Sequence, residues 1–210
     1  MIAKAPVPGR VKTRLTPPCT PEQAAELAEA ALRDTLDVLS TVPAGRRVLV
    51  LDGEPGPWLP PGWRAVPQVA GGLDVRLAAA LGAAPAGAPV LLVGMDTPQL
   101  PAEVLAEALS PTARAGIDTW YGPAADGGFW AVGLARPEPA LAERVLTGVP
   151  MSVPETGAVL RERLAGAGLR VRELPVLTDV DTAAEAAQVA ALVPGGRFAR
   201  VWRSVGAEVR

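Results

Sequence analysis

Continuous apolar runs alternate with longer segments of helical periodicity along this chain, and this alternation constrains its fold most. The runs RVLVL (47–51) and PVLLV (89–93) have no polar face. Strands of this kind lie in sheets that are covered on both sides, and strands that alternate with helices form mainly parallel sheets. We therefore predict an α/β domain with a largely parallel central sheet and helices on both faces.

The expected elements follow from periodicity and from capping signals. Thr20-Pro21-Glu22-Gln23 combines an N-cap, a proline at the first helical position and a capping-box glutamine. Strands are expected at 1–4, 47–51, 89–93, 117–121, 129–134 and 169–174, and helices from 21 to at least 39 and at 73–84, 101–109, 139–146, 154–167 and 183–193. Ligands of such sheets bind beyond the carboxyl ends of the strands, so the residues that follow each strand are the site candidates.

Composition limits the chemistry that those residues can perform. The chain contains no histidine and one cysteine, Cys19. This excludes serine–histidine and cysteine–histidine nucleophiles, zinc sites built from Cys and His, and an intramolecular disulfide. A metal would have to be Mg²⁺, Mn²⁺ or Ca²⁺ on carboxylates. A net charge of −2 does not predict nucleic-acid binding, and no segment predicts a membrane span or a secretory signal, so we expect a cytoplasmic protein.

A basic loop follows the first expected strand. Four of the first fourteen residues are basic, no acid precedes Glu22, and both lysines of the chain are here. Lysine offers a compact charge that suits a phosphate, and glycine lets the backbone approach an anion. We predict a phosphate site in this loop, with a solvated basic segment as the alternative. Its candidate ligands are Lys4, Gly9, Arg10, Lys12, Thr13 and Arg14.

Acidic residues follow other elements. Asp96 comes directly after the 89–93 run, where it could bind a divalent ion or cap the next helix. Asp126-Gly127-Gly128 suits either a hairpin turn or a loop against which a substrate lies. In TDVDT (178–182), Asp181 or Thr182 is expected to cap the last helix in a capping box with Glu185, and a metal site at the Asp-x-Asp sequence is the alternative.

Four segments occur in the order typical of a known family: KAPVPGRVKTRL (4–15), GMDTPQL (94–100), GPAADGGFWAVGL (122–134) and DVDTAAE (179–185). In these segments the chain resembles the DUF2064 family, bacterial glycosyltransferase-like proteins of the nucleotide-diphospho-sugar transferase (GT-A) superfamily. The resemblance covers about residues 1–193. It implies a single Rossmann-like GT-A domain over 1–194 that binds a nucleotide or nucleotide sugar together with Mg²⁺ or Mn²⁺.

The resemblance also implies roles for individual residues. The basic loop would hold the phosphates, and Arg76, in PQVAGGLDVRL (67–77), would be a further nucleotide contact. Asp96 and Asp181 would bind the metal, and Asp126 with Gly127 and Gly128 would face the acceptor. Lys12, Asp96 and Asp126 are thus the expected catalytic residues.

The chain departs from the family pattern in three places. Gly72 and Val75 stand where acids are common, and only three residues precede Lys4, so either the sequence starts too late or the first strand is short. The C-terminal extension 195–210 passes the usual end of the family. It is predicted to form a helix whose apolar face docks on its own domain, with a homodimer through this tail as the alternative; that face comprises Phe198, Val201, Trp202, Val205 and Val209.

Three functions remain open from the sequence. The leading one is a metal-dependent glycosyltransferase that moves a sugar from a nucleoside-diphosphate sugar to a small-molecule acceptor. The first alternative is a guanylyltransferase-like nucleotidyltransferase that uses an NTP and releases pyrophosphate, since both reactions need the same phosphate and metal apparatus. The second alternative is a nucleotide-binding domain without turnover, which the missing acids at 72 and 75 would favour.

Overall fold

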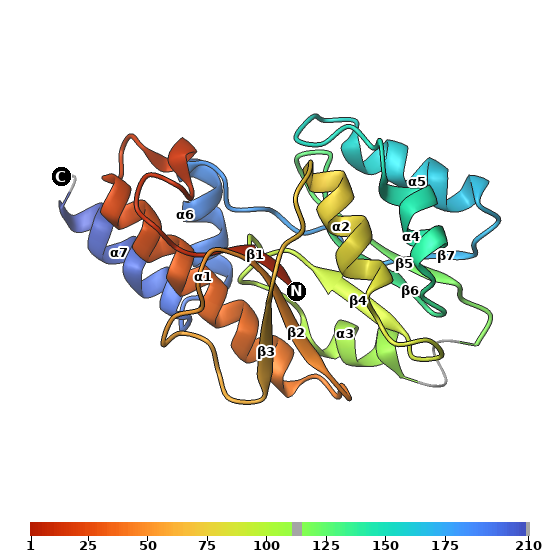
Figure 1. Cartoon of the computed structure of the whole chain (residues 1–210). Coiled ribbons are helices and arrows are strands. Elements are labelled where there is room, and N and C mark those ends of the chain that lie inside the picture. The colour runs from red at the N-terminus through yellow and green to blue at the C-terminus, as the bar shows by residue number, and fades with distance from the viewer. Residues whose placement is uncertain (111–114, 209–210) are drawn as a thin grey trace.

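The computed structural model describes residues 1–110 and 115–208 (Figure 1). Its strands are β1 (Ile2–Lys4), β2 (Arg47–Asp52), β3 (Trp63–Pro67), β4 (Val90–Val93), β5 (Thr119–Pro123), β6 (Phe129–Leu134) and β7 (Val171–Glu173). Its helices are α1 (Pro21–Thr41), α2 (Leu73–Gly82), α3 (Ala102–Leu109), α4 (Pro139–Leu146), α5 (Thr156–Gly166), α6 (Ala183–Leu192) and α7 (Arg197–Glu208), with a 3₁₀ turn, η1, at Thr13–Leu15.

The strands form two sheets rather than one. In the first sheet β1, β2 and β3 are parallel. The second has the order β4-β6-β5-β7, in which β6 is antiparallel to both of its neighbours and β5 is parallel to β7. The sheets meet at β1 and β4, where Ile2 and Leu92 pack in one core cluster and the Lys4 N–H lies 3.2 Å from the Met95 sulfur.

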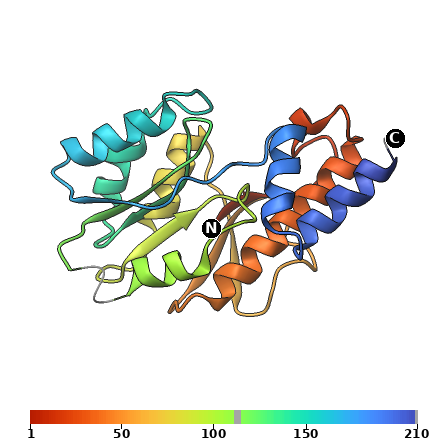
Figure 2. The same cartoon turned by 180° about the vertical axis from the view of Figure 1, so that it is seen from behind.

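Successive strand residues face different helices, which places helices on both faces as predicted. Ile2 and Leu92 pack with α2, α4 and α5, whereas Ala3 packs with α1 and Val93 packs with α3. Figures 1 and 2 show α2, α4 and α5 at one end of the molecule and α1, α6 and α7 at the other. The α/β class is thereby confirmed.

The helix starts confirm the capping signals. Thr20 caps α1 with a complete capping box through Gln23, and Thr182 caps α6 with a box through Glu185. Because Thr182 is the cap, the carboxylate of Asp181 remains available for the site. Asp96 caps nothing either, since the N-cap residue of α3 is Pro101.

The C-terminal extension is helical and packs on its own chain. Phe198 and Val205 of α7 are buried in a cluster with α1 and α6, and Val201 and Trp202 are partly buried against it. Arg197 adds ion pairs to Asp34 and Asp37 of α1. Val209 of the predicted apolar face lies outside the described residues.

Two strand predictions need correction. β3 was not predicted, because Trp63–Pro67 is a half-exposed edge strand without a continuous apolar run. β6 runs antiparallel because the Asp126-Gly127-Gly128 segment reverses the chain between β5 and β6. Among the described residues, no helix is both long and apolar enough to cross a membrane.

Candidate functional site

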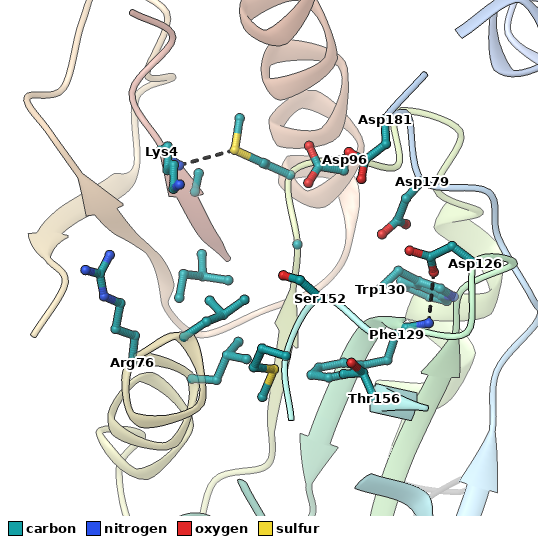
Figure 3. A pocket seen from close by; sticks show the side chains of 18 of the residues that line it. Lys4, Arg76, Asp96, Asp126, Phe129, Trp130, Ser152, Thr156, Asp179 and Asp181 are labelled. Carbon is teal, nitrogen blue, oxygen red and sulfur yellow. Dashed lines mark hydrogen bonds between the residues drawn. The ribbon is translucent and has the colours of Figure 1, made fainter. Parts of the chain in front are cut away.

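A cleft of about 830 Å³ lies beyond the carboxyl ends of β1 and β4, between the two sheets. Its lining comes from the basic loop after β1, the start of α2, the segment after β4, the β5–β6 turn, the loop before α5, and the segment before α6. Figure 3 shows Lys4 and Arg76 on one side and four aspartates gathered on the other. Lys4 and Arg76 thus lie apart from the aspartates of the cleft.

Lys12 lies between two carboxylates at the centre of this site. Its Nζ is 2.5 Å from Asp96 Oδ1 and 3.2 Å from Asp181 Oδ1, and it also donates to the Val180 carbonyl. Only 7% of the Lys12 side chain is exposed. Burial alone would lower the pKa of Lys12, but the Asp96 and Asp181 carboxylates outweigh it and raise that pKa. The lysine is therefore held as a cation.

The chain segments that carry these groups are themselves joined. The Val180 N–H donates to the Asp96 carbonyl over 2.9 Å, which ties the segment before α6 to the end of β4. Arg14 adds an ion pair of 2.9 Å to Asp181 Oδ2. Two residues separated by 85 positions in the sequence, Asp96 and Asp181, thus share one cation.

Asp179 is a fourth acid of the cleft. Its Oδ1 is buried and has no hydrogen-bond partner among the described residues. Burial, together with the nearby carboxylates of Asp96 and Asp126, raises the pKa of Asp179 to about 7. An oxygen left in this state has free capacity for a cation or a hydroxyl donor.

Asp96, Asp126, Asp179 and Asp181 form the acidic wall of the cleft, and Asp126 lies at the end away from Asp181. Its Oδ1 accepts from the Gly128 N–H over 2.8 Å, which fixes the β5–β6 turn. The turn packs on α5: the Gly157 N–H donates to the Gly127 carbonyl over 2.8 Å, and a Cβ on Gly127 would lie 2.1 Å from the Pro154 carbonyl oxygen. The glycines of this turn thus allow its close contact with the start of α5.

Backbone strain is concentrated at the cleft. Among the described residues, the non-glycine residues with positive φ are Lys12 (49°) and Ser152 (61°), and both line it. Such conformations are uncommon outside glycine and persist where the surrounding structure enforces them. At Ser152 the enforcing group is Thr156, whose hydroxyl donates to the Pro150 carbonyl.

The basic wall of the cleft consists of the basic loop with Lys4 and of Arg76 on α2. Arg76 is held in place by its neighbours. It lies 3.3 Å from Asp52 Oδ2 and 3.1 Å from Gln68 Oε1, and Gln68 donates to the Ala3 carbonyl. Asp52 ends β2, Gln68 follows β3, and Ala3 belongs to β1, so this network places Arg76 across the ends of the first sheet.

The cleft brings together most of the residues expected from the sequence. Lining it are Lys4, Arg10, Lys12, Thr13, Arg14, Arg76, Asp96, Asp126, Gly128 and Asp181. Gly9 and Gly127 are not in its lining. Asp179 and Ser152 also line the cleft but were not predicted as site residues. Asp179 lies in the DVDTAAE segment, where nothing in the sequence distinguishes its role from that of Asp181, and Ser152 lies in none of the motifs.

The residues present fit a hard divalent ion. Asp96 and Asp181 already share a cationic group, and Mg²⁺ is commonly held by one or two protein carboxylates with its other ligands from phosphates and water. No group of three or more Asp, Glu, Cys or His side chains with metal-binding geometry occurs within 1–110 and 115–208. A metal here would therefore take the place that the Lys12 ammonium fills.

A family model described as "Uncharacterized protein conserved in bacteria (DUF2064)" matches residues 26–153. The chain belongs to this family. The DUF2064 match contains the segments around Asp96 and Asp126, while the basic loop and the Asp179–Asp181 segment lie outside it. No curated protein sequence matches the chain significantly.

Solved structures with a similar fold include proteins named for nucleotide-sugar chemistry. A Desulfovibrio desulfuricans G20 protein, provisionally named a nucleotide-diphospho-sugar transferase, is 25% identical with a TM-score of 0.85, covering 100% of this chain and 96% of its own. CMP:2-keto-3-deoxy-manno-octonic acid synthetase in complex with CTP is 14% identical (TM-score 0.55; 92% of this chain and 97% of its own). A Mycobacterium sp. strain JC1 homologue of Mycobacterium tuberculosis Rv0371c is 18% identical (TM-score 0.52; 92% and 97%). This DUF2064 chain has a nucleotide-diphospho-sugar transferase-like fold.

Proposed function

We propose that the protein is a metal-dependent glycosyltransferase that uses a nucleoside-diphosphate sugar as donor. The observation that carries this proposal is the shared cation: Lys12 bridges Asp96 and Asp181 in a cleft with a basic wall. With a divalent ion on the two carboxylates, the freed lysine and the basic wall would counter the charge of a diphosphate while the bond between the sugar and the diphosphate breaks. The similarity to the provisionally named transferase of Desulfovibrio desulfuricans supports the same reading.

In this proposal the basic wall binds the donor. Arg10, Lys12 and Arg14 hold the diphosphate, and Arg76 binds the nucleoside end, where Asp52 and Gln68 orient it. Asp96 and Asp181 would hold the divalent ion, which supplies positive charge to the leaving diphosphate. With a metal bound, the Lys12 ammonium would be displaced from the two carboxylates and would pair with a phosphate instead.

The acceptor reacts from the opposite wall. Its hydroxyl oxygen forms a bond to the anomeric carbon of the sugar, and the bond from that carbon to the diphosphate oxygen breaks with its electron pair on the nucleoside diphosphate. The hydroxyl proton passes to the carboxylate of Asp126, which lies at the acidic end of the cleft.

Nucleotidyl transfer is the second candidate. The similarity of fold to the CTP-bound synthetase supports this candidate. In that reaction the α-phosphate of an NTP is attacked and pyrophosphate leaves, with the same residues on the phosphates and the metal. A nucleotide-binding domain without turnover would bind the nucleotide on the basic wall, and its nucleotide affinity would not depend on Asp96.

A thermal-shift panel separates these functions. Nucleoside triphosphates, nucleoside diphosphates and their sugars are added with and without Mg²⁺ or Mn²⁺. A ligand at a hundred times its Kd adds about 2.7 kcal/mol, which is readily measured as a rise in Tm. We expect a metal-dependent rise with a nucleotide sugar that Asp96→Ala removes and Lys12→Ala weakens. A rise with an NTP alone supports nucleotidyl transfer, a metal-independent rise that survives Asp96→Ala supports a binding domain, and no rise contradicts all three.

A further inference from the structure

We propose, on the basis of the proposed function, that the acceptor is an uncharged alcohol joined to an apolar body. The inference concerns the part of the cleft lining that comes from neither the basic loop nor α2. This acceptor wall consists of Asp126, Phe129, Met151, Ser152, Val153 and Pro154, from the β5–β6 hairpin and the loop before α5.

The first argument is charge. The five cations that line the cleft, Lys4, Arg10, Lys12, Arg14 and Arg76, all come from the basic loop or from α2. The described lining residues between 119 and 179 include no cation and include Asp126 and Asp179. A phosphorylated or carboxylated acceptor bound against Asp126 would face like charge, and the acceptor wall has no cation of its own to compensate it, which is unfavourable.

The second argument is the apolar surface that the wall presents. Val153 is 40% exposed, and Leu73, which lines the cleft from the start of α2, is 45% exposed. Phe129 and Met151 also line the cleft and are half-buried. An apolar group seated here would remove this surface from water, which stabilises binding.

The third argument is the pair of polar groups set within this apolar surface. Figure 3 shows the Ser152 side chain directed toward the middle of the cleft, with Asp126 and Thr156 on the same wall. Asp126 Oδ2 makes no hydrogen bond within the described residues, so it can accept from a hydroxyl. Ser152 has a left-handed conformation (φ 61°) in a loop that Thr156 closes through hydrogen bonds with Pro150 and Val153. A few placed polar groups in an apolar wall are typical of sites that orient a small neutral ligand.

Three sugars that differ in charge and apolar area test this acceptor assignment. Phenyl β-D-glucopyranoside carries an apolar body, glucose lacks it, and glucose 6-phosphate adds negative charge. Calorimetry measures the Kd of each with Mg²⁺, first without nucleotide and then with ADP, GDP, UDP, CDP and dTDP added in turn. We expect phenyl glucoside to bind at least tenfold more tightly than glucose 6-phosphate, with glucose between them.

Two matched variants locate the binding. Val153→Glu places a charge on the acceptor wall, while Val176→Glu makes the same change at a valine that is 62% exposed and does not line the cleft. Val153→Glu should weaken phenyl glucoside at least tenfold, and Val176→Glu should leave its Kd unchanged. Both should retain the wild-type Tm without ligand, which shows that the fold is intact, and Val176→Glu should also retain wild-type nucleotide affinity.

The outcomes separate this inference from the proposed function. Tighter binding of glucose 6-phosphate, equal effects of the two variants, or no binding of any sugar overturns the acceptor assignment. If nucleotide still binds in a metal-dependent way, the transferase proposal stands without it. If the sugars bind as expected while no nucleotide binds, the acceptor wall stands as a site for an apolar alcohol and the transferase proposal is overturned.

Discussion

Lys12 determines the charge balance of the cleft at the scale of a single residue. Replacing it with methionine keeps the length of the side chain and removes the cation that Asp96 and Asp181 share. We expect Lys12→Met to bind Mn²⁺ at least tenfold more tightly than wild type without nucleotide, because the competing ammonium is gone. Nucleotide affinity should fall about 10- to 100-fold, since a charge-assisted hydrogen bond contributes about 1.5–3 kcal/mol.

Lys4→Met provides the control for this prediction. Lys4 lines the same cleft, but its side chain makes no ion pair among the described residues. Its substitution should leave Mn²⁺ affinity unchanged, as measured by titration calorimetry. Equal Mn²⁺ affinities in wild type and Lys12→Met would contradict the view that lysine and metal compete for the same two carboxylates.

Individual site residues could be predicted where a strand end marks them. Asp96 follows β4 and was indicated mainly by its position on the sheet, whereas Lys12 was indicated by the clustering of basic residues in the loop after β1. Asp179 could not be separated from Asp181, because which of them is buried depends on the contact between Val180 and Asp96, 84 residues away in sequence. Ser152 left no signal, since its conformation is imposed by hydrogen bonds within its own loop.

At the scale of elements, Gly157 couples the β5–β6 turn to α5. A Cβ at this position would lie 2.4 Å from the Tyr121 hydroxyl and 2.5 Å from the Gly128 carbonyl oxygen. Gly157→Ala should therefore destabilise the fold by roughly 1–3 kcal/mol and displace the turn that carries Asp126. Denaturant unfolding measures the loss of stability.

Gly166→Ala in the same helix is the matched control. A Cβ there meets nothing within 4 Å, so this variant should be as stable as wild type or more stable by up to about 1 kcal/mol. Equal stability of the two variants would show that the close contact between α5 and the turn does not constrain the fold.

Asp118 and Arg170 join the starts of β5 and β7, and this pair predicts a pH dependence. Arg170 donates to both carboxylate oxygens, over 2.7 Å and 3.1 Å. These hydrogen bonds lower the pKa of Asp118 from 3.8 to about 2. Because the folded-state pKa lies below the unfolded value, the pair stabilises the fold above about pH 4, and this contribution is lost as the pH falls toward 2.

Asp118→Asn tests this linkage through Tm measured across pH. The variant should melt below wild type at pH 7, by an amount that corresponds to no more than about 1 kcal/mol because Arg170 is mostly exposed. The difference should shrink below pH 4 and disappear near pH 2. A difference that stays constant from pH 7 to pH 2 would contradict an ionic origin.

Most elements were predicted because their periodicity and caps are local. The direction of β6 and the division into two sheets were not, since antiparallel pairing depends on a turn whose glycines suited two interpretations equally. The placement of the first strand likewise depends on pairing between residues far apart in the sequence. β1 has three residues, yet its register with Val50–Asp52 of β2 suffices to place Lys4 and the basic loop at the cleft.

At the scale of the whole molecule, two sheets with different roles meet at one cleft. The parallel sheet supplies the basic wall, and the mixed sheet supplies the acidic and apolar wall. The C-terminal helix α7 lies away from both, packed against α1 and α6. We therefore propose that donor binding and acceptor binding are assigned to different sheets of the domain.

The most direct test of this account is to identify the phosphate species that leaves the donor. Wild type and Asp96→Asn are incubated with Mg²⁺, phenyl β-D-glucopyranoside and either nucleoside-diphosphate sugars or nucleoside triphosphates, and the products are resolved by ³¹P NMR. We predict release of a nucleoside diphosphate from one nucleotide sugar by wild type and no release by Asp96→Asn. Release of pyrophosphate from a triphosphate, or equal release by the two proteins, would contradict the account.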